Sequence, residues 1–232
     1  MRLPNEAEWP GLLQALDEHG HAVLPAVLDR AECEGLAHLY NRDDAFRSRV
    51  VMARHNFGRG EYKYLRYPLP AAVAALREAL YPRLAPLANS WHQRLRLEPL
   101  FPATLKAYLD FCHKAGQDRP TPLILKYEAG DYNCLHQDLY GELVFPLQAT
   151  VLLSTPGRDF EGGEFLLIEQ RPRMQSKGEV VPLAQGDAVI FAVNHRPVAG
   201  ARGDYRVTMR HGVSRLRAGS RFTLGVIFHD AA

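Results

Sequence analysis

Cysteine is scarce in this chain, and there is no long apolar run. The three cysteines, Cys33, Cys112 and Cys134, are odd in number and lack CxxC spacing. A disulfide framework is therefore not expected, and Cys134 is expected to be a buried thiol. No segment approaches the roughly 18 apolar residues of a membrane span. Residues 1–20 carry acids where a secretory signal would be basic and then apolar. These absences predict a protein of the reducing cytoplasm with no membrane association.

A strong charge of either sign is also lacking. The formal net charge of the 232 residues is +2, with 23% charged and 47% hydrophobic residues, which is the composition of an ordinary globular protein. Low net charge gives no evidence by itself for a polyanionic partner. The length is sufficient for one large domain, or for a core with a helical extension, around a real hydrophobic core.

The N-terminal half reads mostly as helix. Apolar spacing predicts a helix over 9–19 that ends at Gly20. Asp29, with Glu32 three residues later, resembles a capping box for a helix through Tyr40. Two further helices are predicted over 70–94 and 102–114, a short strand over 21–24, and irregular structure over 42–70.

The period becomes strand-like after a turn-rich boundary near residue 120. Eight strand candidates follow, separated by glycine-containing turns: 123–128, 134–138, 145–153, 164–169, 179–183, 188–193, 206–216 and 221–229. Eight short strands at this spacing predict a jelly roll. We therefore expect an α+β protein with a double-stranded β-helix (jelly roll) core over 121–232, and a helical part over 1–120 packed on one face.

The tripeptide His136-Gln137-Asp138 carries the clearest chemical signal. Alternation along a strand would point His136 and Asp138 to one face. In a jelly roll the second and seventh strands meet at the open end, so His211 would join them. Two imidazoles and one carboxylate are a ligand set suited to non-haem Fe(II) with open coordination positions. Arg221, one short strand later, could hold the carboxylate of a bound acid.

The surrounding spacing resembles that of the Fe(II)/2-oxoglutarate-dependent dioxygenases, most closely the prolyl-4-hydroxylase-like branch. The resemblance covers roughly residues 120 to 230 and rests on Tyr127-x-x-Gly130, His136-x-Asp138, His211-Gly-Val213 and Gly219-x-Arg221-x-Thr223-Leu224. The segments LILKYEAGDYNCLHQDLYG and RHGVSR look like a bacterial subgroup of this superfamily that is linked to nucleic acid.

The resemblance implies that Fe(II) is bound by His136, Asp138 and His211, which leaves positions for 2-oxoglutarate and O₂. It further implies oxidative decarboxylation of 2-oxoglutarate to succinate, coupled to hydroxylation of a substrate or to hydroxylation followed by dealkylation. A non-enzymatic jelly-roll module that keeps a metal only for stability is the alternative from another class.

The co-substrate site is expected to contain Arg221, Tyr127, Thr223 and Asn133. Arg221 would pair with the distal carboxylate of 2-oxoglutarate, and Tyr127 and Thr223 would donate hydroxyl hydrogen bonds to it. Prolyl hydroxylases usually carry lysine where this chain has Arg221, but arginine also pairs with a carboxylate, in bidentate fashion. The chain also departs from that pattern at Asn133-Cys134, and both differences weaken the transfer of a peptidyl-proline substrate. A tyrosine that packs on the pleat, a strand threonine and a turn asparagine are the ordinary alternatives.

Several other histidines need an interpretation. His195 is a rival for the distal metal ligand, because Arg202 and Arg206 follow it, but residues 194–197 read as a loop. His229, beside Asp230, is expected to be structural. The remaining candidates are expected on the surface or on helix faces: His55, His92 and His113.

Two basic stretches bear on the substrate. Residues 42–66 contain seven basic residues against three acids, interleaved with Phe57, Tyr62 and Tyr64, and residues 194–221 contain seven arginines and one acid. Basic groups with aromatics suit single-stranded nucleic acid or a flipped base, whereas solvated strand faces are the ordinary alternative. A nucleobase, a protein side chain of the prolyl type and a small molecule therefore stay open as substrates, as does the oligomeric state.

Overall fold

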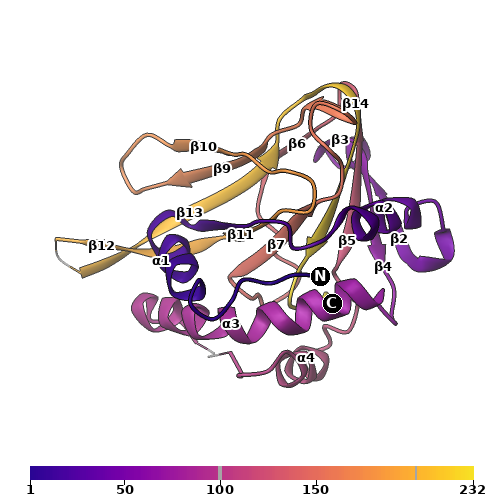
Figure 1. Cartoon of the computed structure of the whole chain (residues 1–232). Helices are drawn as coiled ribbons and strands as arrows, with labels where there is room; N and C mark the ends of the chain where they lie inside the picture. Colours follow the sequence, from indigo (N-terminus) through magenta and orange to yellow (C-terminus); the bar gives the residue numbers. More distant parts are fainter. Residues whose placement is uncertain (99–100, 202) are drawn as a thin grey trace.

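Two antiparallel sheets face each other in the computed structural model, which describes residues 1–98, 101–201 and 203–232 (Figure 1). The large sheet has the order β1 (His21–Leu24), β11 (Ala188–Ala192), β7 (Leu147–Leu152), β14 (Leu216–Val226), β5 (Leu123–Glu128), β4 (Glu61–Leu65) and β2 (Phe46–Val51), with β8 (Phe160–Gly162) pairing with β14. The small sheet has the order β10 (Lys177–Val181), β9 (Phe165–Gln170), β13 (Gly203–Val213), β6 (Tyr132–His136) and β3 (Gly58–Arg59), and β12 (His195–Gly200) pairs with β13. The predicted α+β jelly roll is confirmed.

The described ranges contain four α-helices beside the sheets: α1 (Trp9–His19), α2 (Arg30–Leu39), α3 (Ala71–Leu95) and α4 (Leu105–Lys114). Helix α1 ends at Gly20 in the left-handed region, at φ 78°, and the predicted capping box of Asp29 and Glu32 begins α2. Helix α1 packs on β1 and β11, and α3 runs along the same side of the molecule (Figure 1). No helix among the described residues is long and apolar enough to span a bilayer.

An aromatic cluster attaches α3 and α4 to the strands. Its rings come from Tyr81, Phe101, Tyr108, Phe145 and Phe228, with centroids 4.9 to 6.1 Å apart in edge, tilted and stacked arrangements. All five side chains are buried, so this contact supplies much of the apolar area that fixes the helices on the sheet.

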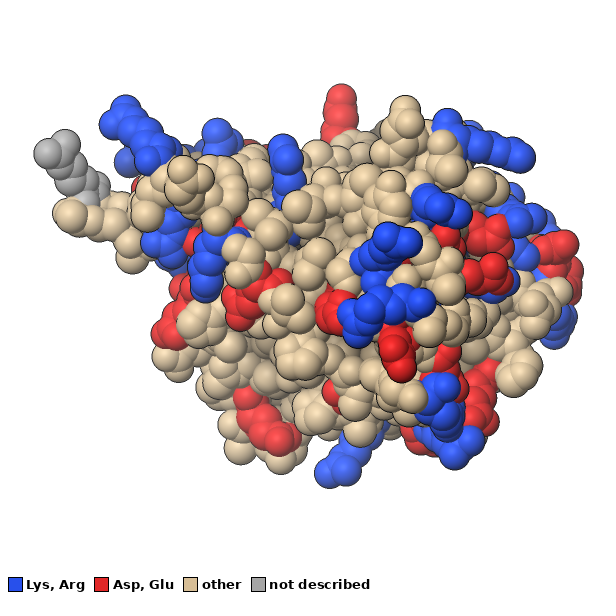
Figure 2. Space-filling model, turned by 90° about the horizontal axis from the view of Figure 1, so that it is seen from above, with Lys and Arg blue, Asp and Glu red and all other residues tan. Residues whose placement is uncertain are grey.

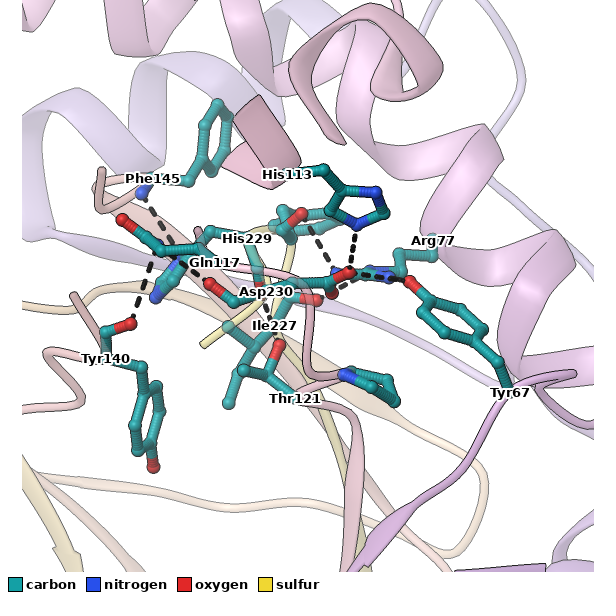
Figure 3. A network of polar contacts seen from close by, with 12 residues as sticks. Tyr67, Arg77, His113, Gln117, Thr121, Tyr140, Phe145, Ile227, His229 and Asp230 are labelled. Carbon is teal, nitrogen blue, oxygen red and sulfur yellow. Dashed lines mark hydrogen bonds and ion pairs between the residues drawn. The ribbon is translucent and has the colours of Figure 1, made fainter. Parts of the chain in front are cut away.

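A buried polar network closes the same side of the fold (Figure 3). Arg77 of α3 donates 2.7 Å to Oδ1 of Asp230, while Tyr67 and His113 contact Oδ2 at 2.9 and 2.8 Å. Gln117 donates to the Asp230 carbonyl at 2.7 Å and to the Leu143 carbonyl at 3.1 Å. The network therefore ties the C-terminal segment to α3 and α4, and Gln117 adds the loop that follows Asp138.

Three predictions of local structure were wrong. The segment 42–70, predicted to be irregular, contains β2, β3 and β4, together with the short helices η1 (Asp43–Ala45) and η2 (Met52–Arg54). Residues 195–200, predicted to begin in a loop, form β12 along β13. The first error concerns strands with distant partners, since β4 pairs with β5 and β3 with β6, whereas β12 pairs with β13, the next strand along the chain. The third error concerns Asp138, which was predicted to end a strand over 134–138 but lies just beyond β6, whose last residue is His136.

Each sheet contains strands from before and from after residue 120.

Candidate metal and co-substrate site

The predicted triad comes together at the mouth of the jelly roll. His136 at the end of β6 lies directly opposite His211 of β13, and their ring centroids are 4.1 Å apart. Nε2 of His211 is 3.2 Å from Oδ2 of Asp138, and Nε2 of His136 is 3.5 Å from Oδ1. The three ligand atoms all lie within 4.8 Å of one another. This is the spacing that three ligands on one side of a single metal ion need.

The ring nitrogens of both imidazoles can serve as metal ligands. Nδ1 of His136 is 2.8 Å from the Cys134 carbonyl, and because a carbonyl can only accept, Nδ1 carries a proton and Nε2 is the nitrogen that would face a metal. Burial would lower the pKa of His136, but the hydrogen bond and charge of Asp138 raise it. Burial, together with the neighbouring His136, lowers the pKa of His211, which keeps that ring neutral. A hydrogen bond from the other ring nitrogen to a backbone carbonyl, like that of His136 to Cys134, commonly orients a metal-bound histidine.

Two side chains that sequence reasoning missed hold the Asp138 carboxylate. The Tyr140 hydroxyl donates to Oδ1 at 2.7 Å, and Nε2 of Gln148 donates to Oδ2 at 2.8 Å. Burial alone would raise the pKa of Asp138, but hydrogen bonds and charge from His136 and His211 outweigh it and hold this pKa well below its ordinary value. The available signal was Gln148, which with Thr150 is one of two polar residues in the fully buried strand β7.

An irregularity in β6 explains which of its residues line the cavity. His136 pairs with His211, and Asn133 pairs with Val213. A step of three residues along β6 therefore matches a step of two along β13, which is the mark of a β-bulge. Asn133 and His136 consequently both face inward, and Cys134 between them is exposed. The expected burial of Cys134 was wrong because simple alternation does not hold across a bulge.

Arg221 is a buried cation with no carboxylate partner. Its side chain is 2% exposed, and no Asp or Glu among the described residues forms an ion pair with it. Nη1 donates to Oγ1 of Thr223 at 2.6 Å, and Nε has no hydrogen-bond partner. Burial lowers the pKa of Arg221 to about 10. Burying a charge without a partner is costly, so this guanidinium is arranged to receive an anion.

The other predicted co-substrate residues surround Arg221. Tyr127 lies opposite it in the β5–β14 register, with the Arg221 guanidinium carbon 5.7 Å from its ring centroid. Asn133 donates to the Tyr127 hydroxyl at 3.2 Å, which leaves the hydroxyl hydrogen free to donate. Thr223 accepts from Arg221 and likewise keeps its own hydrogen. All four side chains line one cavity of about 210 Å³ together with the triad. The structure therefore places every predicted site residue in one chamber.

Comparison with known proteins identifies the family. Residues 60–231 match the model of Oxygenase-NA, described as an oxygenase catalysing oxidative methylation of damaged DNA. The chain belongs to the Oxygenase-NA family. Two uncharacterised Mycobacterium tuberculosis proteins, from strains CDC 1551 and H37Rv, are each 51% identical to it over 165 residues, 71% of this chain and 71% of each relative.

Solved structures similar to this Oxygenase-NA chain share its fold. A Trichoplax adhaerens prolyl hydroxylase in complex with a hypoxia inducible factor peptide fragment has a TM-score of 0.56 at 14% identity, covering 97% of this chain and 90% of that one. A Pseudomonas putida prolyl-4-hydroxylase gives 0.53 at 16%, covering 97% and 99%. A Burkholderia pseudomallei oxidoreductase of the 2OG-Fe(II) oxygenase family gives 0.51 at 18%, covering 100% and 96%.

The rival histidines of the Oxygenase-NA chain lie outside the triad. His195 is in β12, with Nδ1 3.4 Å from Oγ1 of Thr208, and it is not part of the metal-ligand group. His229 is buried and accepts a hydrogen bond from the Phe145 amide at 3.3 Å, as expected for a structural residue. His113 binds Asp230 in the network of Figure 3.

Many cations of the two basic stretches have structural roles in the Oxygenase-NA fold. Arg196 is buried and bonded to Glu169, and Lys63 pairs with Asp43 at 2.7 Å. Of the aromatic residues interleaved with these cations, Tyr62 is half-buried and Tyr64 is buried. Figure 2 shows lysine and arginine interspersed with acidic residues over the visible face. No single basic patch dominates this face, so candidates for a nucleic-acid contact are sought near the cavity.

Proposed function

We propose that this protein is a non-haem Fe(II)- and 2-oxoglutarate-dependent dioxygenase that hydroxylates or oxidatively dealkylates a nucleobase. The observation that supports it best is the pairing of a three-ligand metal group with Arg221 in one chamber. A structural metal would need no buried cation beside it. The family description supports nucleic acid as the substrate.

Each residue has a distinct part in this function. His136, Asp138 and His211 would hold Fe(II), and Tyr140 and Gln148 would orient the Asp138 carboxylate. Bound Fe(II) and 2-oxoglutarate supply the oxidation, in which one atom of O₂ enters succinate, released with CO₂, and the other enters a substrate C–H bond. Where that carbon is an N-methyl group, the hydroxymethyl product releases formaldehyde.

The co-substrate would lie along the wall opposite the metal group. Arg221 would pair with its distal carboxylate, which would satisfy the unpartnered Nε, and Tyr127 and Thr223 would add hydroxyl donors. Because Arg221 and Tyr127 are fully buried, these contacts form away from water and gain strength from the low local dielectric.

The proposal also covers the cellular location of the protein and the roles of the two parts of the chain. Three unpaired cysteines, of which Cys134 is exposed, favour a reducing cytoplasm. We also propose that residues 121–232 carry the chemistry, because all the triad and co-substrate residues lie there. Residues 1–120 would extend both sheets with β1 to β4, cover one side of the roll with helices and help to shape its mouth.

An oligonucleotide assay tests this function. The full chain would be incubated with Fe(II), 2-oxoglutarate, air and single-stranded DNA carrying an N-methylated base, and succinate and formaldehyde would be quantified. We expect both products in excess over the unmethylated strand, and neither from Asp138→Ala. Stimulation by a proline-containing peptide but not by the methylated strand would transfer the function to protein hydroxylation. Absence of succinate under every condition would contradict the enzyme.

A further inference from the structure

The segment 52–59, hereafter the Phe57 loop, forms part of the rim of the metal cavity. The Phe57 ring lines the cavity that contains the triad, yet the residue is 48% exposed. A side chain that both lines a cavity and faces solvent lies at its mouth. Leu139, 49% exposed, lines the same cavity from the segment that follows Asp138. Two large apolar side chains therefore stand at the entrance of the chamber that contains the triad and Arg221.

The Phe57 loop is fixed to the strand that carries His136. The Cys134 amide donates to the Phe57 carbonyl at 2.9 Å, and Gly58 pairs with Asn133. Gly58 has a φ of 126°, and a Cβ there would lie 2.4 Å from the Tyr132 carbonyl, so the close approach of loop and strand requires glycine. Met52, fully buried, anchors the other end of the loop. Phe57 thus keeps a defined position relative to the metal ligands.

The exposed side chains of the loop combine aromatic rings with cations. His55 stacks on Phe57, with ring centroids 5.3 Å apart and an interplanar angle of 24°. Arg54 is exposed and forms no ion pair with any described residue. Arg59 is exposed and has only a 3.7 Å contact with Asp131. Unlike Arg196 or Lys63, these two arginines are not used to stabilise the fold, so their charge is available to a ligand.

We propose that a base of a single-stranded nucleic acid stacks on the Phe57–His55 pair, while Arg54 and Arg59 face the neighbouring phosphates. The proposal rests on the proposed function and specifies how its substrate is held. Flat rings beside exposed cations are the combination that binds single strands, because every base has a face to stack and every link carries a charge. A peptide would use the rings but would leave the two arginines without an anionic partner.

Binding of a fluorescein-labelled single-stranded oligothymidylate to the full chain tests the proposal. Phe57→Ala should weaken binding about 5- to 150-fold, the range that corresponds to loss of one stacked base. Phe57→Trp should retain wild-type affinity. Phe111→Ala is the matched control, because Phe111 is 41% exposed on α4 and lines no part of the metal cavity. Wild-type affinity in Phe57→Ala, or an equal loss in Phe111→Ala, would overturn the proposal.

Fluorescence reports the stacking directly. The chain has two tryptophans, Trp9 and Trp91, and both are buried, so Phe57→Trp introduces an exposed indole. Its emission should be quenched when the oligonucleotide is added. Unchanged emission at saturating oligonucleotide would place the strand elsewhere.

The salt dependence of oligonucleotide binding distinguishes the contribution of the rings from that of the two arginines. The double variant Arg54→Ala/Arg59→Ala should reduce the slope of log K against log salt by about 1.4, since each phosphate contact on a single strand contributes about 0.7. Phe57→Ala should leave the slope unchanged. A slope unaffected by the double variant would remove the arginines from the interface and overturn that part of the proposal.

The outcomes distinguish this proposal from the proposed function. If wild-type protein oxidises the methylated strand but Phe57→Ala binds it equally well, the Phe57 loop is not the stacking surface and the function stands. If the wild type forms succinate but does not bind the oligonucleotide, both the loop proposal and the nucleic-acid substrate fail while the dioxygenase chemistry remains. Competition between a proline-rich peptide and the oligonucleotide for the loop would favour a protein substrate.

Discussion

The hydroxyl of Tyr140 donates a 2.7 Å hydrogen bond to Oδ1 of Asp138, the only carboxylate of the metal group found among the described residues. Gln148 holds the other oxygen from β7. Each Asp138 oxygen therefore accepts one protein hydrogen bond and keeps a lone pair for a metal. The loop that carries Tyr140 is in turn held by Gln117, which bonds both the amide and the carbonyl of Leu143.

Tyr140→Phe should weaken metal binding without removing a ligand. Loss of a hydrogen bond to a metal-bound carboxylate typically costs 10- to 100-fold in metal affinity, and we expect that range for Fe(II) or Mn(II) measured by titration calorimetry. Tyr132→Phe is the control, because Tyr132 is exposed on β6 and lines no part of the metal cavity. Equal metal affinity in Tyr140→Phe and wild type would remove Tyr140 from this role.

His211→Ala and His195→Ala should separate the distal ligand from its rival. The first removes an imidazole whose Nε2 lies 3.2 Å from Asp138, so stoichiometric binding of Fe(II) should be lost. The second removes a ring that lies in β12 outside the ligand group, so binding should persist. Metal content after anaerobic loading and desalting gives the answer. Retained iron in His211→Ala would contradict the assigned triad.

Arg221 and Arg196 offer a matched test of what a buried cation is for. Arg221→Met should raise the 2-oxoglutarate requirement about 10- to 150-fold, since a charge-assisted pair contributes about 1.5–3 kcal/mol. It should not lower stability, because Arg221 has no carboxylate partner in the fold. Arg196→Met should cost about 3 kcal/mol, because it removes the buried ion pair with Glu169 and the hydrogen bonds to the Asp17 and Glu18 carbonyls, while Arg171 stays paired with Glu169.

Urea unfolding measures the stability of the two variants, and titration with 2-oxoglutarate measures their co-substrate affinity. The expected pattern is loss of 2-oxoglutarate affinity with retained stability in Arg221→Met, and loss of stability in Arg196→Met. Unchanged co-substrate affinity in Arg221→Met would show that the guanidinium does not hold the distal carboxylate.

His229 should make the fold sensitive to acid. Burial, with a smaller contribution from Arg77, lowers the pKa of His229 to about 4, against 6.5 for an unperturbed histidine. Between these values the unfolded chain binds a proton that the folded chain does not, so stability is lost as the pH falls. This group should contribute a loss of about 2 kcal/mol between pH 7 and pH 4.5. His229→Asn keeps an acceptor for the Phe145 amide. Its free energy of unfolding, measured with urea, should fall by about 2 kcal/mol less than that of the wild type over the same pH range. Equal losses in both proteins would contradict the shift.

Local patterns carried most of the fold prediction. The capping box at Asp29 and Glu32, and the apolar spacing of α1, act within a few residues of sequence and were predicted correctly. Strand β4 was missed because it pairs with β5, about 60 residues further along the chain, whereas β2 and β12 pair with the strands next to them in the sequence, β4 and β13. Charged residues in β2 and β12 hid the alternation that would have marked them.

The site residues also fall into those that the sequence could predict and those that it could not. His136, Asp138, His211 and Arg221 could be predicted from spacing, because a jelly roll brings its second, seventh and eighth strands to one mouth. Tyr140 and Gln148 could not, because they meet Asp138 only through a turn and through a neighbouring strand. The bulge in β6, which exposes Cys134, also leaves no signal in the residue types alone.

The most direct test of the central claim is succinate formation by the full chain with Fe(II) and 2-oxoglutarate, in air and under anaerobic conditions. The account predicts succinate in air that disappears when either Fe(II) or O₂ is withheld, and that is lost in Asp138→Ala, which removes the carboxylate shared by both histidines. Succinate formation that persists in Asp138→Ala, or none from a wild-type protein shown to bind iron, would contradict it.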